Sequence, residues 1–202
     1  MEALHWRDYL CPWCWLGRDR SAVFEAHGVT VVHVPYDLHP EVPDTGRAVR
    51  PGGRLSQVFD RIGAECGASG IPFHAPTRTP NTRRALETAE LVRRHAPDAF
   101  AAVDDAFFRA NWVDGLDLGD LEVLDQLVAE AGAPVDEIVE RRADGVGSRA
   151  VEESMAIARD HGVTATPAWL IGSLVIPGVQ PLETIDRWVG RVVAREQEVR
   201  RR

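Results

Sequence analysis

The four residues from Cys11 to Cys14, Cys-Pro-Trp-Cys, constrain this chain more than any other segment. They follow a short run that mixes apolar and polar residues, and they open a segment with a helical pattern. Two cysteines three positions apart in the first turn of a helix lie on one face, so their sulfurs can form a disulfide and reopen it. In an intracellular chain with a strand–helix–strand pattern, this spacing is typical of a redox-active pair.

The position of Cys11 predicts which of the two sulfurs attacks. Only a thiolate attacks a disulfide, and an ordinary cysteine with a pKa of about 8.5 is mostly protonated at neutral pH. We expect Cys11 at the N-terminus of the helix, where partial positive charge and unpaired N–H groups stabilise an anion. Pro12 suits the first helical position, where its missing N–H costs nothing. The pattern therefore predicts Cys11 as the nucleophile and Cys14 as the resolving thiol.

Two other uses of the pair stay open at this point: an inert structural disulfide, and half of a zinc site. A zinc site normally takes four ligands, and the sequence contains no second paired-cysteine motif and no paired-histidine motif. We therefore expect no metal. The third cysteine, Cys66, also has two interpretations. It is either a small packed side chain near a helix end or a third redox thiol that receives the disulfide from Cys11.

Composition and charge limit the classes of function. Of the 202 residues, 45% are hydrophobic and 27% are charged, which is typical of an ordinary globular protein. No apolar run approaches the roughly 20 residues of a membrane helix, and no secretory signal precedes Cys11, so we expect a cytoplasmic protein without a membrane partner. A formal net charge of −8 argues against nucleic acid as the main partner. All 23 basic residues are arginine, which excludes a lysine Schiff base.

The first third of the chain predicts a strand–helix–strand unit. Residues 3–9 alternate weakly and residues 29–36 are rich in β-branched side chains, as in two strands. Between them, residues 11–26 have a helical pattern that ends before Gly28. Short connections make such a unit right-handed, with parallel strands. A loop rich in proline and glycine follows over residues 38–53.

The rest of the chain predicts a helical block and then a return to mixed structure. Residues 54–147 show helical spacing and no good strand. After them we expect a helix capped by Ser148, a hairpin over residues 168–176 and a final helix over residues 181–199. The two ends of the chain together then form a four-stranded mixed sheet with helices on both faces, and the helical block is inserted after the second strand.

Six stretches resemble the DsbA-like branch of the thioredoxin superfamily, and within it the FrnE-like proteins. The residues around the cysteine pair and the later Thr166-Pro167 are together specific for this family. The other matching stretches are less specific. The matching stretches are residues 8–17, 36–46, 80–82, 106–110, 162–167 and 177–180.

The resemblance implies a thioredoxin fold with an all-helical insertion. Residues 1–53 and 148–202 then form the thioredoxin-like domain, and residues 54–147 form the inserted helical domain. It also implies a cis peptide bond before Pro167, whose ring covers the sulfurs, and a backbone at Thr166 that pairs with a substrate chain. The Thr166 hydroxyl can donate to the Cys11 thiolate and lower its pKa. Pro12 and Trp13 support the site, and Trp13 cannot donate to the thiolate as a histidine there could.

The activity implied is thiol–disulfide exchange with protein or small-molecule thiols and disulfides. The redox-active disulfide is then the chain's own, so no cofactor is needed, and glutathione can serve as a co-substrate. A rival is a glutathione-dependent isomerase or transferase, because the same branch includes 2-hydroxychromene-2-carboxylate isomerases and kappa-class glutathione transferases. Those enzymes typically have a serine where this chain has Cys11. A non-enzymatic, chaperone-like or metal-storing role is the second rival.

The first strand is more polar than the resemblance leads us to expect. Asp8 and His5 are candidates for proton transfer to or from Cys14, because resolving a mixed disulfide requires deprotonation of that thiol. The plainer alternative puts Asp8 in a surface turn and leaves His5 exposed. A second expectation concerns four tryptophans that could form an apolar docking patch beside the sulfurs: Trp6, Trp13, Trp15 and Trp169.

Overall fold

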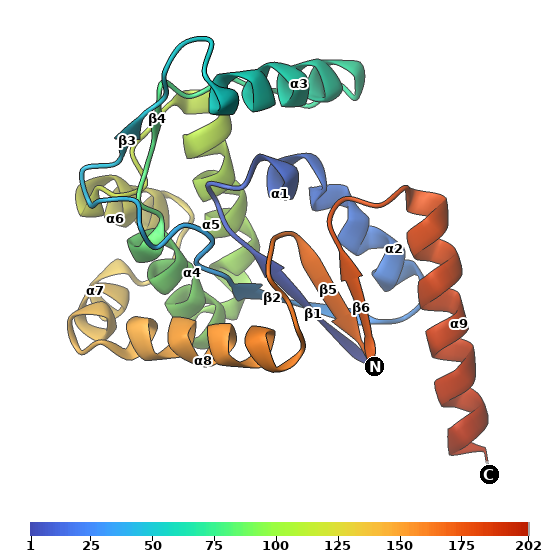
Figure 1. The fold of residues 1–202 in the computed structure, drawn as a ribbon. Coiled ribbons are helices and arrows are strands. Elements are labelled where there is room, and N and C mark those ends of the chain that lie inside the picture. Colours follow the sequence, from blue (N-terminus) through green and yellow to red (C-terminus); the bar gives the residue numbers. More distant parts are fainter. Residues whose placement is uncertain (202) are drawn as a thin grey trace.

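The computed structural model describes residues 1–201 and contains a four-stranded mixed sheet with helices on both faces (Figure 1). The strands are β1 (Glu2–Arg7), β2 (Thr30–Pro35), β5 (Ala168–Ile171) and β6 (Leu174–Pro177), in the order β2-β1-β5-β6. β1 is parallel to β2 and antiparallel to β5, and β5 and β6 form the expected hairpin. The predicted α/β architecture, a thioredoxin fold with a helical insertion, is confirmed.

The single helix predicted between the first two strands is interrupted. It consists of α1 (Pro12–Leu16), the 3-10 turn η1 (Arg18–Arg20) and α2 (Ser21–Ala26). The break follows Gly17, where an added Cβ would lie 2.9 Å from the Val179 side chain and 3.0 Å from the Trp13 carbonyl oxygen. Only glycine permits so close an approach. Gly28, with φ of 72°, ends α2 as predicted.

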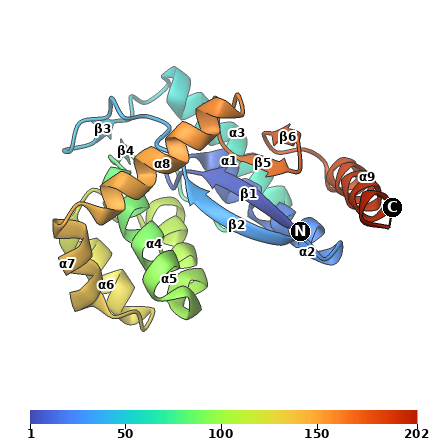
Figure 2. The same cartoon turned by 90° about the horizontal axis from the view of Figure 1, so that it is seen from below.

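The segment between the two halves of the sheet consists of helices, the loops that join them and one short ribbon. Its helices are α3 (Arg54–Ala68), α4 (Arg83–His95), α5 (Pro97–Arg109), the π-helical turn η2 (Ala110–Asp114), α6 (Leu121–Glu130) and α7 (Val135–Ala143). The expectation of no strand here was wrong in one respect, because β3 (Arg47–Ala48) pairs antiparallel with β4 (Arg78–Thr79). Strands of two residues have no alternation to detect. Figures 1 and 2 show α4 to α7 grouped on one side of the molecule, away from α9.

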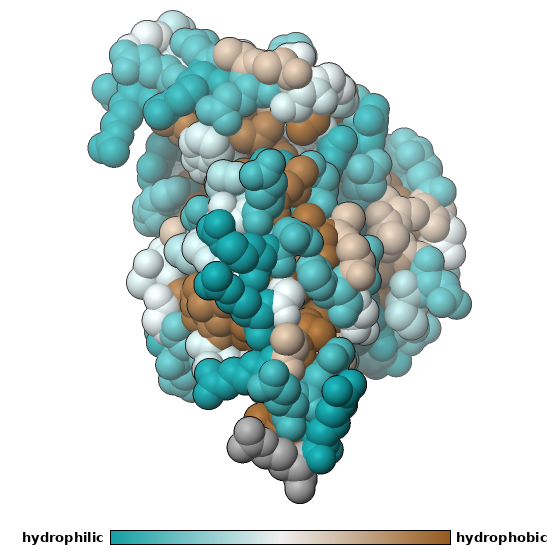
Figure 3. Space-filling model, turned by 90° about the vertical axis from the view of Figure 1, so that its right-hand side faces the viewer, coloured by the Kyte–Doolittle hydropathy of each residue, from teal (hydrophilic) through white to brown (hydrophobic). Residues whose placement is uncertain are grey.

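The last two helices are α8 (Val146–Asp160) and α9 (Leu182–Arg200). The prediction that Ser148 caps a helix was wrong. α8 starts two residues earlier, after Gly145 with φ of 68°, and the Ser148 hydroxyl instead accepts a hydrogen bond from Arg83 at 3.0 Å. α9 buries Ile185 and Val189, and its outer surface is largely hydrophilic (Figure 3). None of the helices within residues 1–201 is both long enough and apolar enough to span a membrane.

The largest hydrophobic cluster joins the cysteine segment to the helical insertion. Cys11, Cys14 and Trp15 belong to the same cluster as Phe59 of α3 and Phe107 of α5. The apolar interior is therefore continuous between the two predicted domains, and their boundaries stay a prediction.

The expected tryptophan docking patch was wrong. Trp6, Trp15 and Trp169 are fully buried, and only Trp13 of the four is partly exposed. Large aromatic side chains in the interior stabilise the fold by burying apolar surface, and they are not exposed to contact a partner.

Candidate active site

The turn after β1 fixes Cys11 at the N-terminus of α1. The Cys11 N–H donates to the Asp8 carbonyl at 3.1 Å, and Pro12 occupies the first helical position. The Cys11 carbonyl then accepts from the N–H groups of Cys14 at 3.0 Å and Trp15 at 3.3 Å. Both cysteines therefore lie in the first turn, as the spacing predicts, and both are free thiols.

The two sulfurs are equally buried but differ in access. Cys11 is 2% exposed and Cys14 is 1% exposed. A cavity of about 400 Å³ opens beside the pair, and its described lining includes Cys11 and not Cys14. An incoming disulfide therefore meets Cys11 first. The cavity lining is mostly apolar, with Leu10, Pro12, Trp13, Leu38, Val42, Leu55, Val58 and Phe59, and it also includes His39, Glu41, Arg47, Thr79, Ala165 and Thr166.

The environment separates the pKa values of the two thiols. Burial opposes charge on Cys11, but hydrogen bonds from Cys14 and Thr166 outweigh it, so the pKa of Cys11 is lowered. Burial and the neighbouring Cys11 raise the pKa of Cys14 well above its usual value. This arrangement makes Cys11 the more readily ionised of the two thiols and keeps the proton on Cys14, as an attacking and a resolving thiol require.

Thr166 and Pro167 lie against the pair, as the resemblance implies. Their peptide bond is cis, and the Cys11 Sγ donates to the Thr166 carbonyl at 3.3 Å. The Thr166 hydroxyl lowers the pKa of both cysteines, yet within residues 1–201 its buried oxygen has no hydrogen-bond partner while both are thiols. An anionic Cys11 sulfur would give that hydroxyl an acceptor.

Asp8 is buried at the carboxyl end of β1, so the alternative of a surface turn was wrong. It is 0% exposed, and its Oδ2 accepts from the Leu38 N–H at 2.9 Å. Its Oδ1 accepts from the Leu10 N–H at 3.2 Å and from the Thr82 hydroxyl at 2.6 Å. Burial raises the pKa of Asp8 to about 6, although these three bonds oppose the rise. The backbone of Asp8 also lowers the pKa of Cys14, against the larger effect of burial.

His5 is buried as well, at 2% exposure, so the alternative of an exposed histidine was wrong. Its ring stacks on Trp169 with centroids 4.2 Å apart, and its Nδ1 lies 2.9 Å from Nδ1 of His33. Burial, His33 and Arg7 hold the pKa of His5 well below its usual value. A ring that stays neutral in this way is a weak proton acceptor, which leaves Asp8 as the better of the two predicted proton-transfer groups.

Residues that sequence reasoning missed fix the strand end behind the cysteines. Asp104 of α5 pairs with Arg7 and accepts from the Tyr9 hydroxyl at 2.9 Å. The Tyr9 carbonyl accepts from Asn111 at 3.1 Å and from the Trp112 indole at 2.8 Å. Their partners lie about a hundred positions away in the sequence, so no local pattern indicates these contacts.

Cys66 lies on α3 inside the largest hydrophobic cluster, and its exposure is 0%. Burial raises the pKa of its thiol, which makes it a poor nucleophile at neutral pH. Separately, no group of three or more His, Cys, Asp or Glu side chains in the described part of the chain could hold a metal ion.

Comparison with known proteins finds the same architecture elsewhere. The model of the DSBA-like thioredoxin domain matches residues 4–189. A probable DsbA oxidoreductase of Streptomyces coelicolor has a TM-score of 0.83 and 24% identity, covering 95% of this chain and 89% of that chain. A 2-hydroxychromene-2-carboxylate isomerase has a TM-score of 0.77 and 20% identity, covering 98% and 99%. The cytosolic disulfide reductase DsbM of Pseudomonas aeruginosa, in a structure with GSH, has a TM-score of 0.67 and 16% identity, covering 99% and 100%. At these identities, the structural matches show a shared fold.

Proposed function

Because the chain belongs to the DSBA-like thioredoxin domain family, we propose that it is an oxidoreductase that exchanges disulfides through Cys11 and Cys14. One observation carries the proposal. Cys11, with its lowered pKa, lines a cavity, and Cys14, with its raised pKa, is not part of the described lining. A structural disulfide has no need of such an asymmetry.

The exchange takes place in two displacements. The Cys11 thiolate attacks one sulfur of a substrate disulfide, so that a mixed disulfide forms and the first substrate thiolate leaves. Cys14 then loses its proton and attacks the Cys11 sulfur, which releases the second substrate thiolate. The substrate disulfide has gained two electrons and leaves as two thiolates, the cysteine pair has become a disulfide, and one proton has left Cys14. A second proton comes from solvent where both substrate thiolates become thiols. The reverse sequence oxidises a dithiol.

Asp8 supports the second displacement as a proton acceptor. Its pKa of about 6 leaves it mainly ionised at pH 7, and its backbone carbonyl accepts from the Cys11 N–H at 3.1 Å, beside the pair. A base is most effective when its pKa lies near the working pH. In the reverse direction the same carboxyl returns the proton to Cys14 as the disulfide opens.

The cavity suggests the size of the reacting group. About 400 Å³ lies within the range of small-molecule sites, and it accepts either a small thiol or a side chain beside a substrate cysteine. We propose protein and small-molecule thiols, glutathione among them, as partners. The chain's own disulfide serves as the redox group, without a bound cofactor. The FrnE-like branch and a cytoplasmic location stay predictions from the sequence.

The same cavity is also compatible with one alternative function. A glutathione-dependent isomerase or transferase would also need an enclosed, mostly apolar site for its small-molecule substrate. In that case Cys11 would hold or activate glutathione, and Cys14 would be dispensable. The two activities therefore differ in what they require of Cys14.

A trapping experiment separates the candidates. The Cys14→Ala variant is mixed with glutathione disulfide and with a disulfide-bonded peptide, and the adducts on Cys11 are identified by mass spectrometry. Disulfide exchange predicts stable mixed disulfides with the variant, turnover by the wild-type chain, and neither with Cys11→Ser. Isomerase activity on a chromene carboxylate in the presence of glutathione, retained in Cys14→Ala, would favour the alternative. Absence of any adduct on Cys11 would overturn the proposal.

A further inference from the structure

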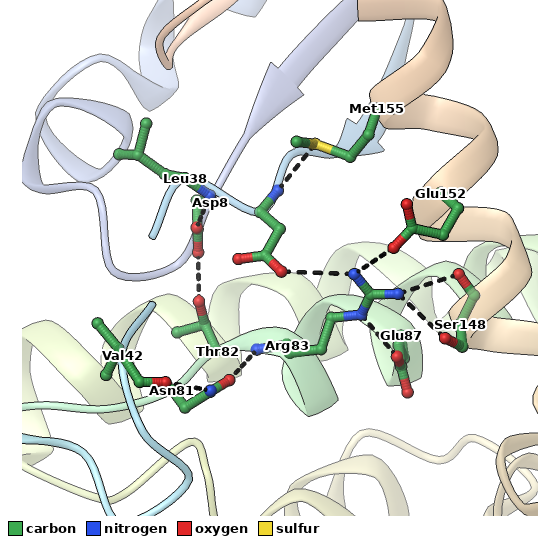
Figure 4. A network of polar contacts seen from close by, with 11 residues as sticks. Asp8, Leu38, Val42, Asn81, Thr82, Arg83, Glu87, Ser148, Glu152 and Met155 are labelled. Atoms are coloured by element: carbon green, nitrogen blue, oxygen red, sulfur yellow. Dashed lines mark hydrogen bonds and ion pairs between the residues drawn. The ribbon is translucent and has the colours of Figure 1, made fainter. Parts of the chain in front are cut away.

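The helical insertion reaches Asp8 through one buried side chain. Thr82 directly precedes α4, is 1% exposed, and donates from its hydroxyl to Asp8 Oδ1 at 2.6 Å (Figure 4). The two residues are 74 positions apart in the sequence. Of the three donors to the Asp8 carboxylate, the other two are the backbone N–H groups of Leu10 and Leu38. The Thr82 hydroxyl is thus the one of these donors that a substitution can remove.

The network in Figure 4 holds Thr82 from both sides. On one side, Asn81 donates to the Val42 carbonyl at 2.6 Å and accepts from the Arg83 N–H at 2.9 Å. On the other side, the Arg83 guanidinium donates to acceptors in the loop after β2, on α4 and on α8. These acceptors are Asp37, Glu87, Ser148 and Glu152. The Thr82 hydroxyl is therefore already oriented toward the Asp8 carboxyl. It needs no reorganisation when Asp8 loses its proton and becomes charged.

Neighbouring charges also act on Asp8. Asp37, from the loop after β2, repels charge on it and is itself paired with Arg83 of α4 at 3.4 Å. The charge of Asp8 also couples to those of Tyr9 and Cys11. In this enclosed setting a single donor has a large effect on whether the carboxyl keeps its proton.

We propose that Thr82 is a positioning residue that sets the pH at which Asp8 carries a proton, and thereby links the helical insertion to proton transfer at the cysteine pair. The second half of this statement rests on the proposed disulfide exchange; the first half stands on the contact itself. Thr82 touches neither substrate nor the reacting sulfurs, so it acts through Asp8.

Two shifts of opposite direction follow from removing the hydroxyl. A hydrogen bond to the charged form of an acid favours that form, so Asp8 should hold its proton to higher pH when the bond is lost. The negative charge of Asp8 raises the pKa of Cys11, so a neutral Asp8 should let the Cys11 thiolate form at lower pH. A purely structural role for Thr82 predicts neither shift.

The test is a carbon NMR titration of the Asp8 carboxyl in the full chain, with Cys11 alkylation against pH as the second readout. Thr82→Val and Thr82→Ala should both raise the Asp8 midpoint by about one pH unit, since a bond to a charged group is worth at least that much. Thr82→Ser keeps a hydroxyl, so its Asp8 midpoint should lie close to that of the wild-type chain. Thr88 is a buried threonine on α4 whose hydroxyl donates to the Arg84 carbonyl instead, so Thr88→Val should leave the Asp8 midpoint unchanged.

Four results would overturn the assignment. One is an unchanged Asp8 midpoint in Thr82→Val and Thr82→Ala, another is an equal shift in Thr88→Val, and a third is an upward shift of Asp8 with no downward shift of Cys11. The last is a failure of both Thr82 variants to fold while Thr82→Ser folds, which would make the role structural. Turnover of glutathione disulfide by the wild-type chain is measured in parallel. Its absence would refute disulfide exchange while the titration still decides the role of Thr82.

Discussion

At the scale of single residues, the reactivity of Cys11 depends on neighbours that are remote in sequence. α1 is only five residues long, so the helix end contributes a modest stabilisation of the thiolate. Thr166 supplies a second contribution from the opposite side, with a buried hydroxyl that has no other partner among the described residues. The sequence predicted both contributions, the second through the resemblance alone.

Replacing Thr166 with valine tests the hydroxyl directly. Thr166→Val removes a donor to the thiolate, so the pKa of Cys11 should rise by about one unit. The measurement is the rate of Cys11 alkylation by iodoacetamide as a function of pH. Thr164→Val, an exposed threonine in the same loop, is the matched control and should leave the curve in place. A pKa in Thr166→Val equal to that of wild type would assign the lowering to the backbone around Cys11.

At the scale of elements, β1 is central in the sheet, and this explains why its polar residues are buried. His5 and Arg7 lie on a strand flanked by β2 and β5, and α5 covers Arg7 with the Phe100 ring and the Asp104 carboxylate. A weakly alternating run gives no indication that a distant helix will bring a partner for each charge. The sequence therefore predicted the strand correctly but left the burial of its side chains open.

Arg83 connects three elements, and its loss should weaken their docking. It bonds to Asp37, Glu87 and Glu152, and Asp37 has a side chain only 9% exposed. Arg83→Ala leaves that carboxylate without its cation, so the free energy of unfolding should fall by about 1–2 kcal/mol. Urea denaturation followed by circular dichroism measures this loss.

Arg84→Ala is the matched control for that measurement. Its side chain is 43% exposed, its ion-pair partner Asp44 is 77% exposed, and it also donates to the Gly119 carbonyl at 3.1 Å. A change within about 0.5 kcal/mol is expected for such a surface site. Equal losses for the two variants would show that the network around Arg83 has no special role.

Local chemistry explains which elements could be predicted. The cysteine pair, the hairpin split by Gly172 and Ser173, and the start of α5 at Pro97 all follow from patterns within a few residues. The β3–β4 ribbon and the contact between Thr82 and Asp8 depend on segments that meet only in the folded chain. The sequence around Thr82 contains no pattern that indicates its role, because Thr82 contacts Asp8 only once α4 has packed against the rest of the fold.

At the scale of the whole molecule, the hydrophobic interior is continuous between the cysteine segment and the helical insertion. Formation of the active site therefore depends on the folding of both parts. Cys11, Cys14 and Trp15 share a hydrophobic cluster with helices of the insertion, so the site is complete only when both parts are folded. The sequence predicted two domains from the interruption of the strand pattern. It could not show how far their apolar surfaces merge, because periodicity identifies a buried face without its partner.

Stability should depend on pH through two buried histidines. Burial lowers the pKa of His33, and burial with its neighbours lowers that of His5, so both stay neutral in the folded chain. The unfolded chain binds their protons below about pH 6.5, which favours unfolding as the pH falls. Asp8 opposes this trend, because its raised pKa lets the folded state bind a proton between about pH 6 and pH 4.

A His33→Leu variant isolates one of these contributions, because Asp8 is common to both proteins. Between pH 6 and pH 5, wild type should lose about 1.2 kcal/mol more stability than the variant. Urea unfolding at a series of pH values measures the difference. A difference that does not change with pH would mean that His33 titrates alike in the folded and unfolded chains.

The central claim is that the fold makes Cys11, and neither of the other two cysteines, a thiolate near neutral pH. Alkylation of the reduced wild-type chain from pH 4 to pH 10, with each cysteine followed separately by mass spectrometry, tests it directly. We predict that Cys11 reacts with a midpoint clearly below about 8.5, the value of a free cysteine, while Cys14 and Cys66 stay unreactive at pH 7. A Cys11 midpoint at or above that value, or a rate at pH 7 no greater than that of Cys66, would contradict the account.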